Sequence, residues 1–323
     1  MPSVLVTRPL PAPGTASLRE AGLQVVEHSR DAPMGRDELL RAVRRVDALL
    51  CMLTDRIDAE VFDAAPGLSI VANFAVGFDN IDVAEATRRG IVVTNTPDVL
   101  TEATADLTWA LLLAAARRVG EGDRLVRAGS WSGWSPTQLL GVPVHGATIG
   151  IVGLGRIGTA VARRARGFDM DVRYASRRRH ERAEAETGAR RVPLDELLRI
   201  SDVVTLHAPL DDTTRHLIDE AALAAMKPTA VLVNTARGAL VDEQALVRAL
   251  RAGTIAAAGL DVFEREPRLS AELAELPNVV LTPHIGSATT QARAAMVKLC
   301  CDNIIGVLAG RPPLTPVEVE AFG

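Results

Sequence analysis

The chain has 323 residues, of which 48% are hydrophobic and 3% aromatic, and its formal net charge at pH 7 is −4. Domains commonly hold roughly 100–200 residues, so this length predicts two domains. The slightly acidic balance argues against a nucleic-acid partner, which would require a broad basic surface. No apolar stretch approaches the ~20 residues that span a bilayer, so we expect no membrane partner. The start, MPSVLVTRP, lacks the features of a signal peptide.

Strand-like and helix-like segments alternate along the chain. The predicted strands are 3–7, 46–52, 69–73, 91–94, 147–152, 171–175, 202–206, 229–234, 255–260 and 279–281. They are apolar on both faces, which is typical of strands buried in a parallel sheet. The segments between them with helical spacing of apolar residues include 36–45, 156–167, 194–200, 219–226 and 242–252. This alternation predicts an α/β fold with two Rossmann-like domains, each a doubly wound parallel sheet.

Two longer helical patterns mark the passages between the domains. The first, 101–119, is rich in Ala and Leu and opens with a Thr–Glu start typical of a helix cap. The second, 288–309, stops at Gly310 and Pro312.

The two passages define the predicted domains. A discontinuous, flavodoxin-like substrate (catalytic) domain would consist of 1–100 plus 288–323, and an NAD(P)-binding Rossmann domain of 101–287. The segment 120–146 shows little periodicity, and we expect it to be irregular.

The cysteines give no sign of a metal site or a disulfide. Cys51, Cys300 and Cys301 are odd in number and lack metal-like spacing, and the last two are neighbours that cannot readily pair. We expect three small buried side chains, no metal, and a location in the reducing cytoplasm.

The strongest local motif is ATIGIVGLGRIGTAVARRARGF at 147–168. Gly153 permits a tight turn, Gly155 lets the backbone approach a pyrophosphate, and Gly158 lets the helix pack on the strand. The helix N-terminus offers free N–H groups to the phosphates. Three glycines alone are a weak signal, but a strand before and a helix after them predict a dinucleotide site. Its predicted contacts are Gly153, Leu154, Gly155, Arg156, Ile157 and Gly158.

The end of the next strand indicates which dinucleotide binds. NAD-specific folds place an acid about 20 residues beyond the glycines, to bind the ribose hydroxyls. Here the chain has Ser176, Arg177, Arg178 and Arg179, and a hydroxyl beside clustered guanidinium groups suits a 2′-phosphate. We therefore predict NADP as the preferred cofactor, with NAD possible. The alternative is a solvated helix start with ordinary surface arginines.

Three polar residues follow successive predicted strands. They are Arg237 in VLVNTARGALVDE, Glu266 in GLDVFEREP and His284 in VVLTPHIGSAT. Open α/β sheets bind ligands at the carboxyl ends of their strands, so we expect the three to converge on the nicotinamide. Singly, each has an ordinary explanation as a surface arginine, a loop acid or a turn histidine. Their combination behind a dinucleotide motif favours a catalytic site.

The chemistry of these three residues fits reduction of a 2-oxo acid. Hydride that reaches the carbonyl carbon builds negative charge on the oxygen, which His284 can protonate near neutral pH. Glu266 would fix the tautomer of the ring and favour the imidazolium. Arg237 would bind the substrate carboxylate and polarise the keto oxygen.

Ordered matches over nearly the whole chain resemble the D-isomer-specific 2-hydroxyacid dehydrogenase family, and within it the glyoxylate/hydroxypyruvate reductases. The matching segments are NFAVGFDNIDV (73–83), GIVVTNTPDVLTEATADLTWALLLAAARR (90–118), TIGIVGLGRIG (148–158), HAPLDDTTRHLI (207–218), NTARGALVDE (234–243), GLDVFEREP (259–267) and LTPHIGSAT (281–289).

The resemblance implies further site residues. The backbone N–H groups of Val76 and Gly77 would bind the substrate carboxylate. Cofactor contacts would come from Thr104, His207, Ala208, Pro209, Thr213, Thr235, Ala236, Asp261 and Gly286, with Asp261 accepting from the nicotinamide carboxamide. The resemblance also implies a homodimer formed through the nucleotide domain, in which Trp134 of SGWSP reaches a partner's active site. An interface or surface-packing role for Trp134 is equally open.

Several functions stay open within this resemblance. The main hypothesis is NADPH-dependent reduction of glyoxylate or hydroxypyruvate to the D-2-hydroxy acid. Phosphoglycerate dehydrogenases tend to have arginine where this chain has Asn73, and formate dehydrogenases have glutamine in place of Glu266. Phosphite dehydrogenases share the three catalytic residues, and pocket shape does not exclude a D-lactate type. A dinucleotide-sensing corepressor is the non-enzymatic alternative, disfavoured by the lack of extended tails.

Overall fold

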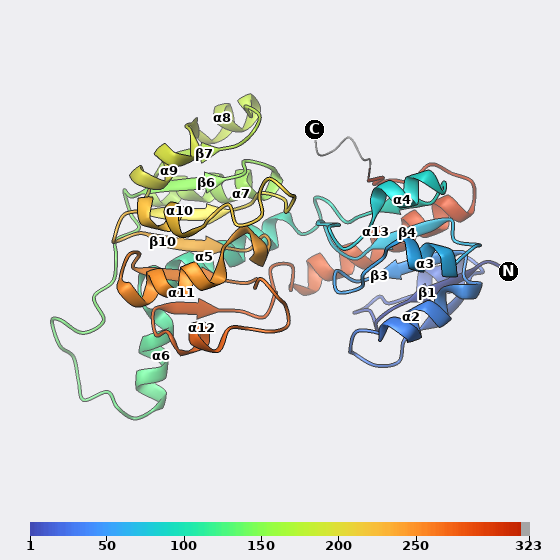
Figure 1. The fold of residues 1–323 in the computed structure, drawn as a ribbon, viewed down its shortest axis with the longest axis horizontal. Helices are drawn as coiled ribbons and strands as arrows, with labels where there is room; N and C mark the ends of the chain where they lie inside the picture. The colour runs from blue at the N-terminus through green and yellow to red at the C-terminus, as the bar shows by residue number, and fades with distance from the viewer. Residues whose placement is uncertain (318–323) are drawn as a thin grey trace. The chain divides into compact units, whose positions relative to one another are not determined.

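The computed structural model describes residues 1–317 and divides the chain into two compact units (Figure 1). Unit 1 consists of Met1–Leu100 and the described part of Ser287–Gly323, and unit 2 is Thr101–Gly286. Each unit has its own parallel sheet with helices between the strands. The predicted α/β architecture with two doubly wound sheets is therefore confirmed.

The sheet of unit 1 has five parallel strands in the order β2-β1-β3-β4-β5. The strands are β1 (Ser3–Val6), β2 (Gln24–Glu27), β3 (Ala48–Cys51), β4 (Ile70–Asn73) and β5 (Val92–Thr94). This is the flavodoxin-like order, in which the strand sequence reverses between β1 and β3. The carboxyl ends of all five strands lie at the same edge of the sheet.

Helices cover both faces of this sheet. They are α1 (Ala16–Glu20), α2 (Arg36–Ala42), the short 3-10 helix η1 (Val43–Arg45), α3 (Ala59–Ala64), α4 (Val83–Arg88) and α13 (Thr290–Leu308). The long helix α13 packs against β3, β4 and β5, so the end of the chain returns to the core of unit 1. One core cluster consists of aliphatic residues together with Cys51 and Phe62.

The sheet of unit 2 has seven parallel strands in the order β12-β11-β10-β9-β6-β7-β8. The strands are β6 (Thr148–Val152), β7 (Asp171–Ala175), β8 (Arg190–Arg191), β9 (Val203–Leu206), β10 (Val231–Asn234), β11 (Ala257–Leu260) and β12 (Val279–Leu281). The strand order reverses between β6 and β9. The crevice beside such a reversal is where open α/β sheets bind nucleotides.

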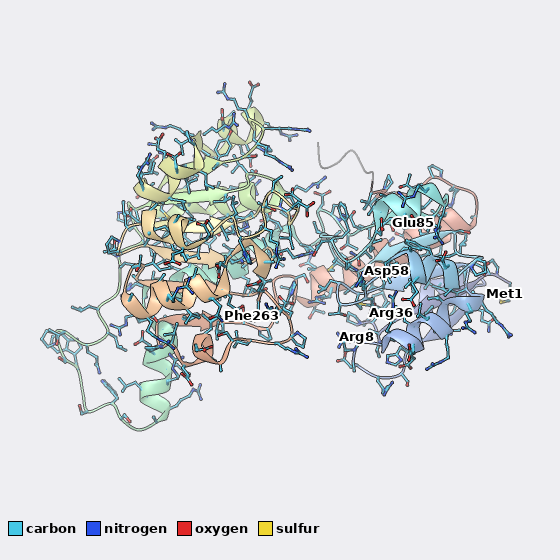
Figure 2. The ribbon with its side chains drawn as sticks, viewed as in Figure 1. Met1, Arg8, Arg36, Asp58, Glu85 and Phe263 are labelled. Carbon is cyan, nitrogen blue, oxygen red and sulfur yellow. The ribbon has the colours of Figure 1, made fainter. Side chains whose placement is uncertain are left out.

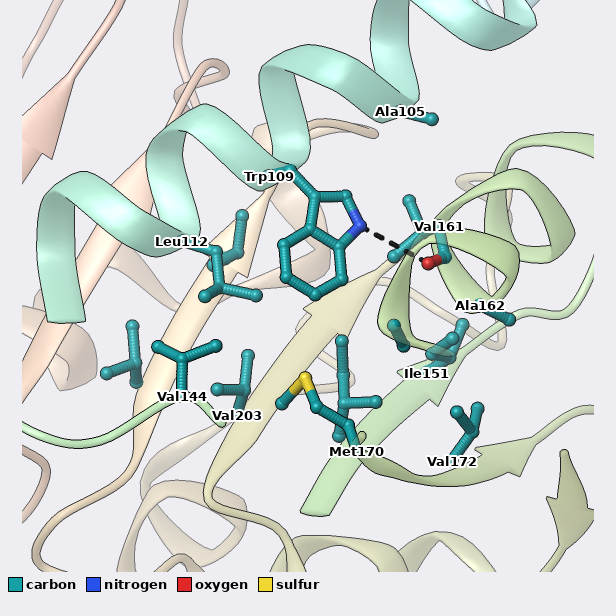
Figure 3. Close-up of a cluster of buried hydrophobic side chains, with 14 of the residues drawn as sticks. Ala105, Trp109, Leu112, Val144, Ile151, Val161, Ala162, Met170, Val172 and Val203 are labelled. Atoms are coloured by element: carbon teal, nitrogen blue, oxygen red, sulfur yellow. Dashed lines mark hydrogen bonds between the residues drawn. The ribbon is translucent and has the colours of Figure 1, made fainter. Parts of the chain in front are cut away.

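The helices of unit 2 pack mainly through small aliphatic side chains. They are α5 (Thr101–Ala116), α6 (Val119–Arg127), α7 (Arg156–Ala165), η2 (Arg166–Phe168), α8 (Glu181–Thr187), α9 (Leu194–Ile200), α10 (Glu220–Ala225), η3 (Gly238–Leu240), α11 (Glu243–Ala252) and α12 (Ala271–Glu275). Trp109 of α5 is an aromatic exception, and its ring stacks on that of Phe168 with 4.7 Å between the ring centroids. Its indole N–H donates to the carbonyl of Val161 at 3.2 Å (Figure 3).

The structure contains several elements that the sequence analysis did not predict, among them strands β2 and β8, helix α6 and the short helices α1, α3, α4, α8 and α12. Strands β2 and β8 were not predicted, since both are edge strands with mostly exposed residues and lack an apolar run. The start of the segment expected to be irregular, 120–146, belongs to helix α6. Its two glycines weaken the helical signal, whereas ion pairs Arg118–Glu121 and Arg127–Asp123 at helical spacing support the helix.

Many charged side chains of unit 1 form surface ion pairs, such as Arg36 with Asp58 and Glu60 (Figure 2). All three cysteines are buried and free, as predicted. Within residues 1–317, no group of His, Cys, Asp and Glu side chains is arranged to hold a metal ion. Over the same range, no helix combines the length and apolarity needed to cross a membrane.

Candidate active site

The turn after β6 leaves no room for side chains at two of its glycines. Gly153 has a φ of +93°, and a Cβ there would lie 2.7 Å from the carbonyl carbon of His207. A Cβ on Gly158 would collide with the carbonyl oxygen of Gly153. The backbone of this turn therefore packs directly against both the end of β9 and the first turn of α7.

Helix α7 begins at this turn without a side-chain cap. Its N-cap residue is Gly155, and no acidic side chain lies in the first turn. The first N–H groups of a helix have no intrahelical acceptor, and the helix dipole adds positive potential there. Together these features fit an anionic group such as a diphosphate.

A cavity of about 790 Å³ lies at the carboxyl ends of β6, β7 and β9. The predicted cofactor residues that line it are Gly153, Leu154, Gly155, Ser176, Arg177, His207, Ala208, Pro209 and Thr213. Four contacts predicted from the glycine motif and the following strand, Arg156, Ile157, Gly158 and Arg178, do not line it, and neither do the residues predicted near the nicotinamide. The volume is within the usual range for small-molecule pockets.

Among the polar residues that line the cavity, His180 and Arg191 were missed by the sequence interpretation. The imidazole Nε2 of His180 lies 3.1 Å from the Ser176 hydroxyl. Arg191 donates to the carbonyl oxygens of Ser176 and Arg177 at 2.8 and 3.0 Å. Arg191 comes from the edge strand β8, so no short motif joins it to the serine. The remaining lining residues are Val152, Ala175, Val192, Pro193, Leu194, Thr214 and Leu217.

His207 contributes a neutral ring to the cavity. Burial lowers the pKa of the His207 imidazole to about 3. Its Nε2 lies 2.9 Å from the hydroxyl of Thr205 on β9, the strand that His207 follows. At neutral pH the ring of His207 is therefore an uncharged part of the cavity wall that can still form hydrogen bonds.

Glu266 and His284 form a hydrogen-bonded pair. The Nδ1 atom of His284 lies 2.8 Å from Oε2 of Glu266, and both side chains are 27% exposed. The backbone N–H of Phe263 donates to the other carboxylate oxygen at 3.0 Å (Figure 2 labels Phe263). With Nδ1 engaged, Nε2 is the ring nitrogen left to serve a ligand.

The surroundings of Glu266 keep its carboxylate ionised. Burial would raise its pKa, but the hydrogen bond and charge of His284 act in the opposite direction. The N–H of Phe263 and the charge of Arg237 add to that effect, and the pKa lies below its ordinary value of 4.5. At neutral pH Glu266 is therefore an anion next to the imidazole.

The loop that carries His284 is held by Asp261, which is fully buried at the end of β11. One carboxylate oxygen accepts from the Thr282 hydroxyl at 2.6 Å and the Ile285 N–H at 2.8 Å, and the other from the Gly286 N–H at 2.7 Å. Burial raises the pKa of Asp261, and this effect is larger than the opposite effect of the hydrogen-bond donors. His284 itself has a φ of +54°, an uncommon conformation that this clamp maintains.

Arg237 follows β10 in a turn fixed by Asn234. The buried Asn234 side chain donates to the carbonyl of Arg237 at 2.8 Å and accepts from the N–H of Ala236 at 3.0 Å. The neighbouring Gly238 packs on the backbone of Phe263, which leaves no space for a Cβ. The arginine turn and the Glu266 loop are therefore in direct contact.

The other residues predicted near the nicotinamide also lie in unit 2. The hydroxyl of Thr235 is 2.8 Å from that of Thr108, and both residues are buried. A Cβ on Gly286 would lie 3.2 Å from Asp261 and 3.4 Å from Thr104. Thr104, Asp261 and Gly286 thus gather beside the His284 loop.

The predicted site residues of unit 1 lie after β4. Val76 and Gly77 are partly exposed, whereas Asn73 is fully buried, with its amide donating to the carbonyl of Gly77 at 2.8 Å. Asn73 therefore supports the loop from within. In unit 2, the side chain predicted to reach a partner, Trp134, is 83% exposed.

Unit 2 thus combines an anion-binding turn with an acid–base pair at one edge of one sheet. The turn and its cavity follow β6, β7 and β9, and Arg237, Glu266 and His284 follow β10, β11 and β12. All six strands are parallel, so their carboxyl ends share that edge. The arrangement can bind a dinucleotide and move a proton.

Comparisons with known proteins agree with this geometry. Residues 109–286 match the family model described as D-isomer specific 2-hydroxyacid dehydrogenase, NAD binding domain. The chain belongs to this family. It is 56% identical over 325 residues to a glyoxylate reductase of Thermococcus onnurineus. The aligned region covers 99% of this chain and 97% of that relative.

Solved structures show the same fold over the full length. A protein of Thermus thermophilus matches with a TM-score of 0.92 and 49% identity, covering 98% of this chain and 100% of that one. An NADPH-dependent glyoxylate/hydroxypyruvate reductase of Sinorhizobium meliloti, in complex with NADP and malonate, has a TM-score of 0.85 and 38% identity, covering 98% and 96%. The chain is therefore a 2-hydroxyacid dehydrogenase that uses a nicotinamide dinucleotide.

Proposed function

We propose that this enzyme reduces a small 2-oxo acid, glyoxylate or hydroxypyruvate, to the D-2-hydroxy acid with NADPH. The observation that carries the proposal is the 2.8 Å pair between Glu266 and His284, at the edge of the sheet that bears the dinucleotide turn. Several relatives that are 50–56% identical over 99% of the chain are named glyoxylate reductases, which supports this substrate class.

His284 is the proposed general acid. Reduction of a ketone or aldehyde needs a proton on the carbonyl oxygen as negative charge develops there. Nε2 of His284 can deliver that proton, because Nδ1 is engaged by Glu266 at 2.8 Å. The ionised Glu266 fixes the tautomer and compensates the positive charge of the protonated ring.

Two groups are proposed to recognise the substrate carboxylate. In unit 2, the guanidinium of Arg237 can donate paired hydrogen bonds to a carboxylate and polarise an adjacent keto oxygen. In unit 1, the N–H groups of Val76 and Gly77 provide neutral donors. A carboxylate beside the reacting carbonyl is the feature that separates 2-oxo acids from simple aldehydes.

The cofactor would occupy the cavity at the ends of β6, β7 and β9. When bound, a nicotinamide dinucleotide supplies the hydride. The uncapped start of α7 would hold its diphosphate, and Ser176 and Arg177 its 2′-phosphate, with Arg178 nearby in sequence. Thr104, Thr235, Ala236, Asp261 and Gly286 are the residues we assign to the nicotinamide side.

We also propose that the enzyme is a homodimer. Helix α6 and the irregular segment after it project from the sheet of unit 2 (Figure 1). The irregular segment exposes large apolar side chains, with exposed fractions of 83% for Trp134, 54% for Trp131 and 66% for Leu140. Large apolar side chains exposed in one segment are typical of interaction surfaces. Light scattering after size exclusion would show a monomer if this proposal were wrong.

The function is tested with a substrate panel. Oxidation of NADPH and of NADH would be followed by absorbance with glyoxylate, hydroxypyruvate, pyruvate and bulkier 2-oxo acids. We expect glyoxylate or hydroxypyruvate to give the highest kcat/KM, and NADPH to exceed NADH. Reduction of NADP by phosphite or formate, without turnover of any 2-oxo acid, would refute the proposal in favour of a different dehydrogenase.

A further inference from the structure

Consecutive carbonyl groups in the loop after β4 are held by donors from the segment after β5. The carbonyl of Ala75 accepts from the backbone N–H of Thr96 at 2.9 Å. The carbonyl of Val76 accepts from the side-chain amide of Asn95 at 2.8 Å. These contacts fix the planes of two successive peptide groups.

The orientation of these planes determines where the N–H groups point. A trans peptide is planar and carries its C=O and N–H on opposite sides. A donor on the Ala75 carbonyl therefore turns the Val76 N–H the other way, and Asn95 does the same for Gly77. Within residues 1–317, neither N–H donates to a protein acceptor. Both remain available to a ligand.

Asn73 secures the following peptide from within the unit. Its side-chain amide donates to the carbonyl of Gly77 at 2.8 Å, and its side-chain carbonyl oxygen accepts from the thiol of Cys51 at 3.5 Å. Asn73 is fully buried. It therefore fixes the exit of the loop, whereas Asn95 acts on the peptide that carries the Gly77 N–H.

Asn95 is itself held by the last described segment of the chain. Its carbonyl accepts from the Thr315 hydroxyl at 2.7 Å, and its N–H donates to the Thr315 carbonyl at 3.3 Å. Asn303 of α13 donates to the same hydroxyl at 3.0 Å. The backbone from which the Asn95 side chain extends is thus held by a segment more than 200 residues away in sequence.

We propose that Asn95 is a positioning residue that aims the Gly77 N–H at the carboxylate of the 2-oxo acid. This inference rests on the proposed function and adds a determinant of substrate affinity to it. Gly77 has no Cβ to restrict rotation of the peptide before it. Without Asn95 that peptide can turn its carbonyl oxygen toward the substrate, which replaces attraction of the carboxylate by repulsion.

The test replaces the amide donor and measures substrate affinity separately from rate. Asn95→Leu keeps nearly the same volume without a donor, and Asn95→Ala removes the side chain. Hydrogen bonds to a charged group change binding by about ten-fold or more, so we expect KM for glyoxylate and Ki for oxamate to rise about 10-fold together. The KM for NADPH should not change, and kcat should fall less than about 3-fold.

A matched control removes a similar bond elsewhere in unit 1. The hydroxyl of Ser3 donates a hydrogen bond of 2.7 Å to the carbonyl of Arg45, a residue that precedes β3. Ser3→Ala should leave KM and Ki unchanged. A second measurement needs no variant: oxamate added to the 15N-labelled, NADPH-loaded enzyme should shift the Gly77 amide resonance.

The outcomes separate this inference from the proposed function. If the unmodified enzyme neither reduces a 2-oxo acid nor binds oxamate, the proposed function fails. If it does both, but Asn95→Leu keeps the original KM or loses only kcat, the positioning role is overturned. An unmoved Gly77 resonance would overturn it as well, even if the Asn95 variants did not fold.

Discussion

The two halves of the candidate site in unit 2 use different parts of the chain. On the dinucleotide side, the turn from Gly153 to Gly158 presents backbone N–H groups, and Gly153 and Gly158 are needed because other backbone lies where a Cβ would be. On the acid–base side, the working groups are side chains from three separate loops, and buried residues such as Asp261 and Asn234 fix those loops.

Because of this difference, we expect that mutations can alter cofactor binding and the chemical step separately. A change in the glycine turn fills space and shifts the backbone, so it should weaken the binding of the cofactor. A change at Glu266 or His284 removes a proton carrier or its partner, so it should slow the reaction with the cofactor still bound. Each half therefore predicts its own kinetic signature.

The largest effect should come from His284→Ala. Loss of a general acid typically lowers the rate by roughly 10²–10⁴-fold, so we expect kcat to fall about 10³-fold. Titration of NADPH fluorescence should give an unchanged Kd. His145→Ala is the matched control, since that histidine is 76% exposed and lies outside the site. Near-normal turnover in His284→Ala would remove this residue from the mechanism.

The second largest effect should be on the affinity for the cofactor, with little effect on the rate. In Gly158→Ala the new methyl group meets the Gly153 carbonyl, and overpacking of this sort distorts the turn. We expect the Kd for NADPH to rise about 100-fold, while kcat at saturating NADPH changes little. Gly167→Ala is the control, because nothing lies within 4 Å of a Cβ there. Equal Kd values for the two variants would contradict the role of the turn.

The third effect concerns the choice of cofactor. Replacing Ser176 with Asp and Arg177 with Ala puts an anion where we place the 2′-phosphate. Because a charged hydrogen-bonded contact is lost, the ratio of kcat/KM for NADPH to that for NADH should fall about 30-fold. Arg199→Ala, which removes a surface arginine paired with Asp195, should leave the ratio as it was. An unmoved ratio in the double variant would refute the NADP assignment.

Local sequence was enough to predict the dinucleotide turn and the parallel sheet around it. The turn is contiguous with a strand and a helix, and the strands are apolar runs. The pairing of Glu266 with His284 also followed, because both were placed at the ends of parallel strands. The edge strands β2 and β8 were missed because their residues are few and exposed.

Supporting residues could not be predicted because their partners are far away in sequence. Arg191 approaches Ser176 only once β8 pairs with β7, and Asn95 is aimed by Thr315 from the end of the chain. The buried Asp261 was assigned to the cofactor, yet its carboxylate accepts three hydrogen bonds from the His284 loop. Such roles depend on tertiary contacts, which no motif records.

The smallest effect, and the sharpest test of the acid–base half, is expected from Glu266→Gln. The contact with His284 holds the pKa of Glu266 below 4.5, so the carboxylate is ionised throughout the neutral range. This anion accepts from the Nδ1 side of the ring, so it compensates positive charge on the ring while the proton moves at Nε2. The neutral amide removes that compensation, so the rate of reduction at neutral pH should be about 10-fold lower.

The decisive measurement is the pH profile of kcat/KM for glyoxylate in both enzymes. Toward acidic pH the two profiles should converge, because Glu266 of the unmodified enzyme loses its charge as the pH falls through its lowered pKa and then resembles the amide. The affinity for NADPH should remain the same, since Glu266 lies outside the residues that line the dinucleotide cavity. Equal rates of the two enzymes at neutral pH would mean that the carboxylate orients the ring and that its charge contributes nothing to the reaction. An altered affinity for NADPH would show that the two halves are not separable.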